Sequence, residues 1–349
     1  MSQTDIGEVL VEALHQRILD EDVLRKLWHM DAPWQSSGRM EAATVKLGKL
    51  LYRQAMTREA QLYGLRLRRT LIDGFRMAWL TNHSSKKQRG TLLLLHGLSA
   101  EKAHWLRFAR YFVKDYRVLI VDLPAHGQTG YQAGRDYSTQ AQAERILALL
   151  DYLNIDQAHV VGNSMGGFIA QRLACLAPKR VASLALFDAA GLPARSHSAL
   201  ETALRTERNP FLLHSLAEFD AFMGLAAYKL PWMPSQVRVM MARQYYERRE
   251  RWFDIFMHML REIYPHSWLM EQIGQIKMPT MVLWGEKDGL LDVDMLAHYE
   301  ELLPHAQIVK LPNTGHLPMM ERPARSARYY SEFLKNNFSL KRLAVRSVA

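Results

Sequence analysis

The sequence has one cysteine, Cys175, among its 349 residues, which excludes an internal disulfide. Cys175 falls in a stretch with a helical pattern, and we interpret it as a small core residue. No run of about 18 apolar residues appears, so no membrane-spanning helix is predicted. Residues 1–5 lack the basic and then apolar pattern of a secretory signal. We therefore expect a cytoplasmic location.

Signatures of metal and nucleotide binding are also missing from the sequence. The 14 histidines show no His-Glu-x-x-His motif and no comparable spacing of metal ligands. The Gly-x-Gly-x-x-Gly and Walker patterns that hold dinucleotides and phosphates are absent as well. We therefore expect the protein to use neither a metal ion nor a cofactor.

Positive charge is unevenly distributed along this basic chain, whose formal net charge is +10. Residues 39–89 hold 12 Lys and Arg against three acids, and residues 341–349 add three cations without an acid. Such segments attract anionic lipid or nucleic acid. No zinc-finger, helix-turn-helix or RNP-type motif accompanies them, so no nucleic-acid partner is expected. Two interpretations stay open: a solvated basic face, and peripheral contact with an anionic surface at the inner membrane.

Strand and helix patterns alternate from about residue 65 onward. The pair Asp73-Gly74 lies between two strand-like runs and predicts a hairpin. Helical patterns separate the apolar runs that predict buried strands, at residues 91–95, 118–121, 158–161, 181–187, 281–284 and 308–311. This alternation predicts an α/β fold with a mostly parallel sheet flanked by helices. Ligands of such a fold bind beyond the carboxyl ends of the strands.

Two segments depart from the alternation. Apolar residues from Ile6 to Ile18 recur at helical spacing, and a basic helix is predicted further on. Together these helices form an N-terminal leader, which either covers the core or lies on a membrane. Residues 192–275 show no strand pattern and hold 7 of the 18 methionines, which suits a helical cap that binds an apolar group. The predicted division is a helical leader (1–64), an α/β core (65–191 and 276–340), a helical cap or lid (192–275) and a basic tail (341–349).

The clearest functional signal is the stretch VVGNSMGG at residues 160–167. Ser164 lies between Gly162 and Gly166, after a predicted strand and before a predicted helix, as a G-x-S-x-G nucleophile elbow requires. The serine of such an elbow sits on a strained, tight turn, so its flanking positions must lack a Cβ atom. The start of the helix also favours developing negative charge. The sequence predicts a nucleophile at Ser164; a glycine-rich turn with a bystander serine is the alternative.

Two further candidates follow later strands, Asp288 and then His316. The chain order Ser, Asp, His is the order of α/β-hydrolases. His316 would take the proton of Ser164, and Asp288 would orient His316 and stabilise its cationic form. Asp188, at an earlier strand end, and Asp292, a near neighbour, are rival acids.

Hydrolysis through a serine also needs two N–H groups aimed at the developing oxyanion. We predict that the backbone of Met165, next after the nucleophile, supplies one of them. The backbone of Leu98, in the loop after the first buried strand, is predicted to supply the other. His96 and His126 are interpreted as structural loop residues that brace neighbouring turns.

Three stretches within residues 65–340 resemble the α/β-hydrolase superfamily. They read HGLSAEKAHW at 96–105, GNSMGG at 162–167, and WGEKD at 284–288 followed by HLPMMERP at 316–323. These stretches are similar to those of bacterial family V lipases and mammalian membrane-associated monoacylglycerol lipases. The resemblance implies a serine carboxylic ester hydrolase. It would act on lipid-like esters, either monoacylglycerols or medium-chain acyl esters, through an acyl-enzyme.

Two alternative functions stay open. Related motifs occur in C–C bond hydrolases of aromatic ring-fission products, whose pockets bind a substrate carboxylate. Arg172 and the arginines of residues 192–275 could supply that contact. The second alternative is a non-catalytic binding protein with a hydrolase fold.

Overall fold

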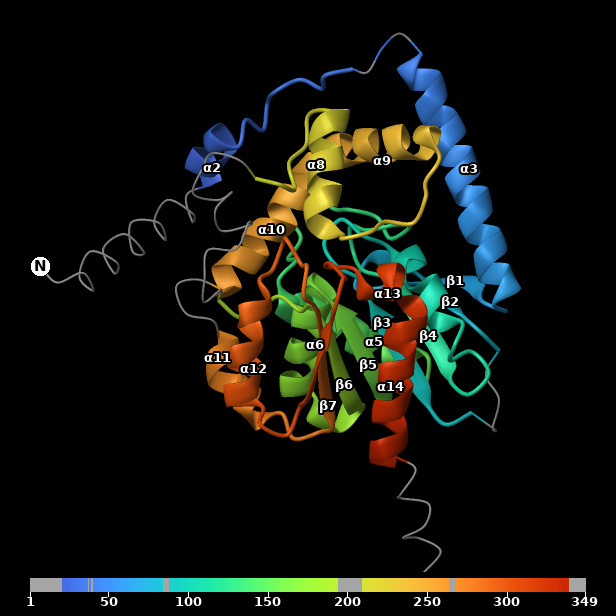
Figure 1. Cartoon of the computed structure of the whole chain (residues 1–349), viewed down its shortest axis with the longest axis vertical. Coiled ribbons are helices and arrows are strands. Elements are labelled where there is room, and N and C mark those ends of the chain that lie inside the picture. Colours follow the sequence, from blue (N-terminus) through green and yellow to red (C-terminus); the bar gives the residue numbers. More distant parts are fainter. Residues whose placement is uncertain are drawn as a thin grey trace, which may run out of the picture.

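The computed structural model describes residues 21–36, 38, 40–83, 88–193, 209–263 and 268–338. An eight-stranded sheet in the order β1-β2-β4-β3-β5-β6-β7-β8 forms its centre (Figure 1). The strands are β1 (Arg66–Ile72), β2 (Phe75–Thr81), β3 (Thr91–Leu95), β4 (Arg117–Asp122), β5 (Ala158–Asn163), β6 (Val181–Phe187), β7 (Thr280–Gly285) and β8 (Gln307–Leu311). The pairings of β2 with β1 and β4 are antiparallel, and the other pairings are parallel. The predicted α/β fold with a mostly parallel sheet is confirmed.

The hairpin predicted at Asp73-Gly74 is also confirmed. Ile72 pairs with Phe75 across the turn, so the connection has two residues. Both turn residues have positive φ, 46° at Asp73 and 76° at Gly74. Such a turn matches the right-handed twist of the strands that it joins.

Helices occupy the intervals between the strands and extend before and after them. The helices of the leader and core are α2 (Glu21–Leu27), α3 (Glu41–Leu62), η1 (Lys102–Trp105), α4 (Leu106–Ala109), α5 (Thr139–Tyr152), α6 (Met165–Leu176), η2 (Pro178–Arg180), η4 (Val293–Met295), α12 (Leu296–Leu302), α13 (Pro318–Glu321) and α14 (Pro323–Phe338). Those between β6 and β7 are α8 (Leu216–Ala226), α9 (Ser235–Glu247), α10 (Arg249–Ile263), α11 (Trp268–Gln272) and η3 (Ile273–Gln275). Every helix among the described residues is too short or too polar to span a bilayer.

Alternate side chains of the central strands belong to two hydrophobic cores, one on each face of the sheet. Leu93 and Leu95 of β3 pack in a core with α5, α6 and α12. Leu92 and Leu94 point to the other face and pack with α4 and α14. This arrangement explains why the central strands are continuously apolar, since a parallel sheet is buried on both sides.

The described residues between β6 and β7 form a helical insertion, defined here as 209–263 and 268–275. In Figure 1 its helices α8 and α9 lie above the sheet, and α11 lies beside it, next to α12. Its aromatic side chains, such as Phe222 and Trp252, belong to the same core cluster as α6. Glu262 of α10 fixes the insertion to the core, because it accepts hydrogen bonds from Thr139 and Arg172. The insertion is therefore packed continuously onto the core.

The leader helix α3 packs along α9 of the helical insertion, at the side of the molecule in Figure 1. Val45 of α3 clusters with Val237 and Met240 of α9. At Gly48 the two helices meet so closely that a Cβ atom would lie 2.1 Å from the carbonyl oxygen of Gln236. The predicted basic helix of the leader thus covers the insertion. The helix predicted from Ile6 to Ile18 and the tail 341–349 lie outside the described residues.

One predicted helix is shorter than its pattern suggested. The apolar spacing of Trp105, Phe108, Ala109 and Phe112 predicts one continuous helical face. The structure has a short 3₁₀ turn followed by α4, which ends at Ala109. All four side chains are nevertheless buried in the core below α14. The spacing therefore predicts the burial of these side chains but not the length of the helix.

Candidate active site

The turn around Ser164 is strained and tightly packed, which explains its glycines. Ser164 follows β5, precedes α6 and has φ 55° and ψ −121°. A Cβ atom at Gly162 would lie 2.1 Å from the carbonyl oxygen of Gly166. One at Gly166 would lie 2.4 Å from the carbonyl oxygen of Leu95. Both positions need glycine, as the elbow motif predicts.

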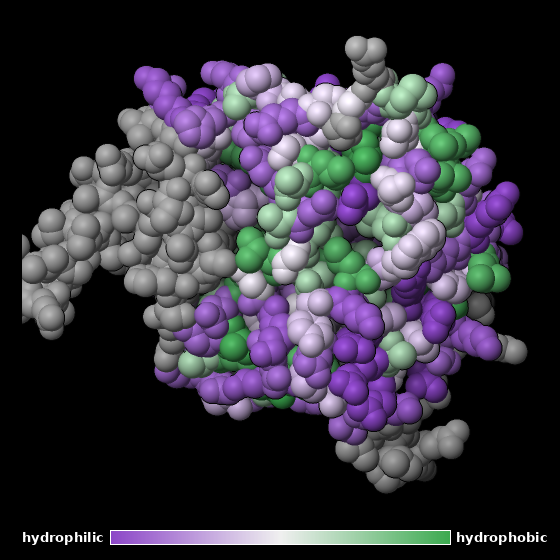
Figure 2. Space-filling model, turned by 45° about the horizontal axis from the view of Figure 1, so that its top comes forward, coloured by the Kyte–Doolittle hydropathy of each residue, from purple (hydrophilic) through white to green (hydrophobic). Residues whose placement is uncertain are grey.

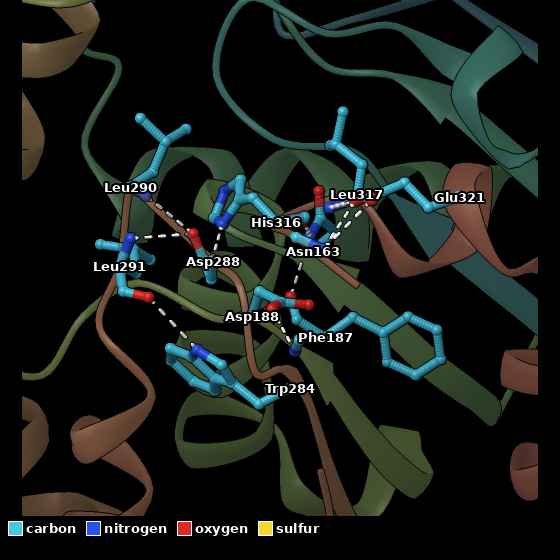
Figure 3. A network of polar contacts seen from close by, with 12 residues as sticks. Asn163, Phe187, Asp188, Trp284, Asp288, Leu290, Leu291, His316, Leu317 and Glu321 are labelled. Atoms are coloured by element: carbon cyan, nitrogen blue, oxygen red, sulfur yellow. Dashed lines mark hydrogen bonds and ion pairs between the residues drawn. The ribbon is translucent and has the colours of Figure 1, made fainter. Parts of the chain in front are cut away.

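His316 and Asp288 form a buried pair at the carboxyl end of the sheet (Figure 3). The Nδ1 atom of His316 lies 2.7 Å from Oδ2 of Asp288, and the Asp288 side chain is 0% exposed. The backbone N–H groups of Leu290 and Leu291 donate to Oδ1 of Asp288 at 2.8 and 3.0 Å. A carboxylate beside Nδ1 keeps the proton of a neutral imidazole there, so Nε2 becomes the acceptor.

Asn163 connects the elbow to the loop that carries His316. Its Nδ2 atom donates to the carbonyl oxygens of Phe187 at 3.0 Å and His316 at 2.9 Å. Ser164 and His316 line one cavity of about 720 Å³. Within the described part of the chain, the Ser164 hydroxyl forms no hydrogen bond, so it is available to a group that enters this cavity.

The two rival acids have other partners. Asp188 accepts the N–H of Gly285 through Oδ1 at 2.8 Å. Its burial, and secondly the negative charge of the nearby Asp288, raise the pKa of Asp188 well above the usual value. Asp292 caps η4 by accepting the N–H of Asp294 at 3.2 Å. The acid that the structure pairs with His316 is therefore Asp288.

The N–H groups predicted to form an oxyanion hole have no backbone or side-chain acceptor among the described residues. They belong to Met165, the first residue of α6, and to Leu98, in the loop after β3. A Cβ atom at Gly97 would lie 3.0 Å from Cβ of Ser164, so this loop touches the elbow. Unpaired N–H groups beside a helix start favour a developing anion.

His96 and His126 brace the loops after β3 and β4, as the sequence predicts. The Nε2 atom of His96 accepts the N–H of Leu123, and Nε2 of His126 accepts the N–H of Ser99, both at 3.1 Å. Each Nδ1 atom lies within 2.9 Å of a carbonyl oxygen of its own loop. Burial lowers the pKa of both rings, so both are neutral and act as cross-links.

The cavity extends from Ser164 between α3 and the helical insertion. Large apolar side chains of the insertion line it: Phe211, Phe219, Phe222, Met223, Met240, Met241 and Trp252. Tyr52 of α3 donates to the buried carboxyl of Glu101 in its wall, and burial raises the pKa of Glu101. Sequence reasoning missed this contact, because nothing in the pattern relates residues 49 positions apart.

Arg172 does not line the cavity. Its guanidinium donates to Glu262 at 2.9 Å and lies 3.2 Å from the ring centre of Trp268. The expectation that Arg172 could bind a substrate carboxylate is therefore wrong. Among the described arginines of the insertion, Arg248 lines the cavity.

One group of side chains in the described residues is close enough to share a metal ion. Potential ligand atoms of Asp188, Asp288 and His316 all lie within 4.8 Å of one another. Asp288 already accepts three hydrogen bonds, from His316 and two backbone N–H groups. A carboxylate surrounded by N–H donors in this way suits a hydrogen-bonded Asp–His pair better than a metal site.

The chain is similar to known proteins over most of its length. The description of the family whose profile matches residues 92–329 is "Alpha/beta hydrolase family". "Lipase 1" of Psychrobacter immobilis is 32% identical over 266 residues, which are 76% of this chain and 82% of that protein. "Monoacylglycerol lipase ABHD6" of Homo sapiens is 30% identical over 256 residues, 70% of this chain and 75% of that protein.

A solved structure is similar over most of the chain. The crystal structure of "a membrane phospholipase A" superimposes with a TM-score of 0.78 at 32% sequence identity. The match covers 83% of this chain and 92% of that one. The likeness therefore extends over most of the fold.

Proposed function

Because the chain belongs to the alpha/beta hydrolase family and is an ester-hydrolysing enzyme, we propose that it is a serine carboxylic ester hydrolase of lipid-like esters. Ser164 is the proposed nucleophile, His316 the base and Asp288 its orienting acid. The observation that carries the proposal is the 2.7 Å hydrogen bond between His316 and Asp288, in a cavity wall that also contains Ser164.

The proposed reaction proceeds through an acyl-enzyme. Ser164 Oγ attacks the ester carbonyl while Nε2 of His316 takes its proton, and Asp288 stabilises the imidazolium. The N–H groups of Leu98 and Met165 hold the oxyanion. His316 then protonates the leaving alcohol, and afterwards it activates the water that releases the acid.

The proposed substrates are monoacylglycerols or medium-chain acyl esters. The size and apolar lining of the cavity suit an acyl chain, because such sites bury most of an apolar ligand. The names of the relatives, a lipase and a monoacylglycerol lipase, support the same class of substrate. We accordingly propose residues 192–275 as a cap on the core 65–191 and 276–340, with the leader 1–64 beside it.

We also propose peripheral contact with an anionic membrane at the end of the molecule that carries α3 and α9. Leu47, Leu50 and Leu51 of α3 are exposed beside lysines, and Trp232 near α9 is 87% exposed. Figure 2, in which this end comes forward, shows apolar surface in patches among hydrophilic surface. Replacing Leu50 and Leu51 by Glu should reduce sedimentation with anionic vesicles; unchanged sedimentation would refute the contact.

A single substitution tests the proposed nucleophile. Ser164→Ala should abolish hydrolysis of p-nitrophenyl butyrate while circular dichroism and the melting temperature stay close to those of the wild type. Ser235→Ala, at an exposed position of α9 that does not line the cavity, is the matched control and should retain activity. Full activity of Ser164→Ala would refute the assignment.

A C–C bond hydrolase is the second candidate, and Arg248 favours it. This guanidinium lines the cavity and forms no ion pair among the described residues, so it could receive a substrate carboxylate. Turnover of dienol ketone acids, compared with that of esters of similar size, separates the two reactions. We propose ester hydrolysis as the faster one.

A further inference from the structure

Asp188 is a buried acid that the proposed mechanism leaves without a role. Asp188 is 0% exposed, and its carboxyl oxygen Oδ1 accepts the N–H of Gly285. The other oxygen, Oδ2, is out of contact with solvent and receives no hydrogen bond from a donor within the described residues. A buried carboxylate needs partners for both oxygens, so a full negative charge is poorly accommodated here. A neutral carboxylic acid fits this environment better.

The sheet brings Asp188 directly to the His316–Asp288 pair. Asp188 follows β6, and the neighbouring strand β7 leads to Asp288. Potential ligand atoms of the three side chains all lie within 4.8 Å of one another. Figure 3 shows both acids below the imidazole ring in that view. The backbone carbonyl of Asp188 also accepts the N–H of Ser164 at 3.1 Å.

Two buried acids this close do not both ionise, and the donors decide which one keeps the charge. Asp288 accepts two backbone N–H groups and the imidazole N–H, whereas Asp188 accepts one N–H. Burial and the nearby Asp288 both raise the pKa of Asp188. The charge therefore belongs to Asp288 and the proton to Asp188.

We infer that Asp188 is a positioning residue, which stays protonated at neutral pH and donates its O–H to the Asp288 carboxylate. The inference rests on the proposed triad. The O–H gives Asp288 one more donor and keeps its charge aimed at His316. It also leaves Asp288 as the one charged acid of the pair, beside Glu321, which accepts the N–H groups of Gly315 and Leu317. A second charge would favour the imidazolium, which cannot accept the proton of Ser164.

Two variants separate this role from a merely structural one. Asp188→Asn keeps the shape, a neutral charge and an N–H donor, whereas Asp188→Leu keeps the volume and removes all hydrogen bonding. The kcat of Asp188→Leu should fall on the order of tenfold with little change in KM, as expected for losing one hydrogen bond to a charged group. Asp188→Asn should stay within about threefold of the wild type, because it retains that bond.

The pH profile of kcat/KM gives the readout that a structural role would not move. Its acidic limb reports protonation of the catalytic base. For Asp188→Asn this limb should coincide with that of the wild type, because neither side chain carries charge. A shift to lower pH by half a unit or more would show that Asp188 is ionised and would overturn the inference. Equal loss of kcat in both variants would also overturn it.

Infrared difference spectroscopy, wild type minus Asp188→Asn, tests the protonation state without using activity. A protonated carboxyl C=O band at neutral pH that moves in D₂O is expected, and its absence would refute the inference. Labelling of Ser164 by a fluorophosphonate reports separately on the proposed function. Labelling without the infrared band means that only the role of Asp188 fails. The band without labelling means that the proposed triad fails and the positioning role fails with it.

Discussion

The imidazole rings of His96 and His126 lie 4.9 Å apart, and each accepts an N–H from the loop that carries the other. These reciprocal bonds cross-link the ends of β3 and β4 directly beside the elbow. The loop of His96 also contains Leu98, whose N–H is a proposed oxyanion donor. The position of that donor therefore depends on a side chain that does not line the cavity itself.

His126→Phe tests this dependence. The phenyl ring keeps most of the volume but leaves the N–H of Ser99 without its acceptor, so the Leu98 loop should shift. We expect kcat for p-nitrophenyl butyrate to fall on the order of tenfold with little change in KM, because the lost contact acts mainly in the transition state. His126→Gln, whose side-chain oxygen can accept the same N–H, should lose less. A kcat of His126→Phe equal to that of the wild type would contradict this account.

Gly48→Ala tests the contact between α3 and α9. The new Cβ atom would lie 2.1 Å from the backbone carbonyl oxygen of Gln236, so the helices must separate. The free energy of unfolding in urea should fall by about 1–3 kcal/mol, as for overpacking elsewhere. Gly224→Ala in α8 is the matched control, because nothing lies within 4 Å of its added Cβ atom. If Gly48→Ala proves as stable as that control, α3 does not pack as described.

Arg172→Met tests whether this arginine is structural. It leaves Glu262 without its cation, in an ion pair whose side chains are 13% and 14% exposed. Breaking a buried pair of this kind should reduce the free energy of unfolding by about 3 kcal/mol. KM for short esters should remain unchanged, because Arg172 does not line the cavity. Arg238→Met, which breaks an exposed pair with Asp220, should cost less than about 1 kcal/mol. A raised KM for short esters with an unchanged free energy of unfolding would place Arg172 in the substrate site instead.

Acid should destabilise the protein partly through His159. Burial lowers the pKa of this histidine to about 4, whereas an unfolded histidine titrates near its usual value of about 6.5. The unfolded chain therefore binds the proton first, and stability falls as the pH drops from about 6.5 to about 4, by on the order of 3 kcal/mol. His159→Gln should lose less stability over that window in urea titrations. The exposed His305→Gln should follow the wild type. Parallel curves for His159→Gln and the wild type would rule out this contribution.

The sequence reveals those features of the fold and the site that depend on local rules. Gly162 and Gly166 mark the elbow because the close approach of the backbone excludes a Cβ atom at each. Asp288 and His316 could be placed at the carboxyl edge because each follows a predicted strand. Leu98 and Met165 could be named because backbone donors depend on position in the chain rather than on side-chain type.

Features that depend on how distant elements meet could not be read in the same way. Arg172 and Glu262 are 90 residues apart, and no periodicity relates them. The sequence offers Asp188 only as a rival acid, whereas the structure places it beside Asp288, because β6 and β7 lie side by side. The contribution of α3 to the cavity wall was missed for the same reason. Its amphipathic pattern fits a membrane surface and a protein surface equally well.

Trapping the acyl-enzyme tests the central claim most directly. The full chain would be mixed with p-nitrophenyl butyrate, quenched in acid within the first turnovers, digested and analysed by mass spectrometry. The account predicts a butyryl group on the peptide that contains Ser164, and no such group in Ser164→Ala. A butyryl group on another residue, or rapid turnover by Ser164→Ala, would contradict it.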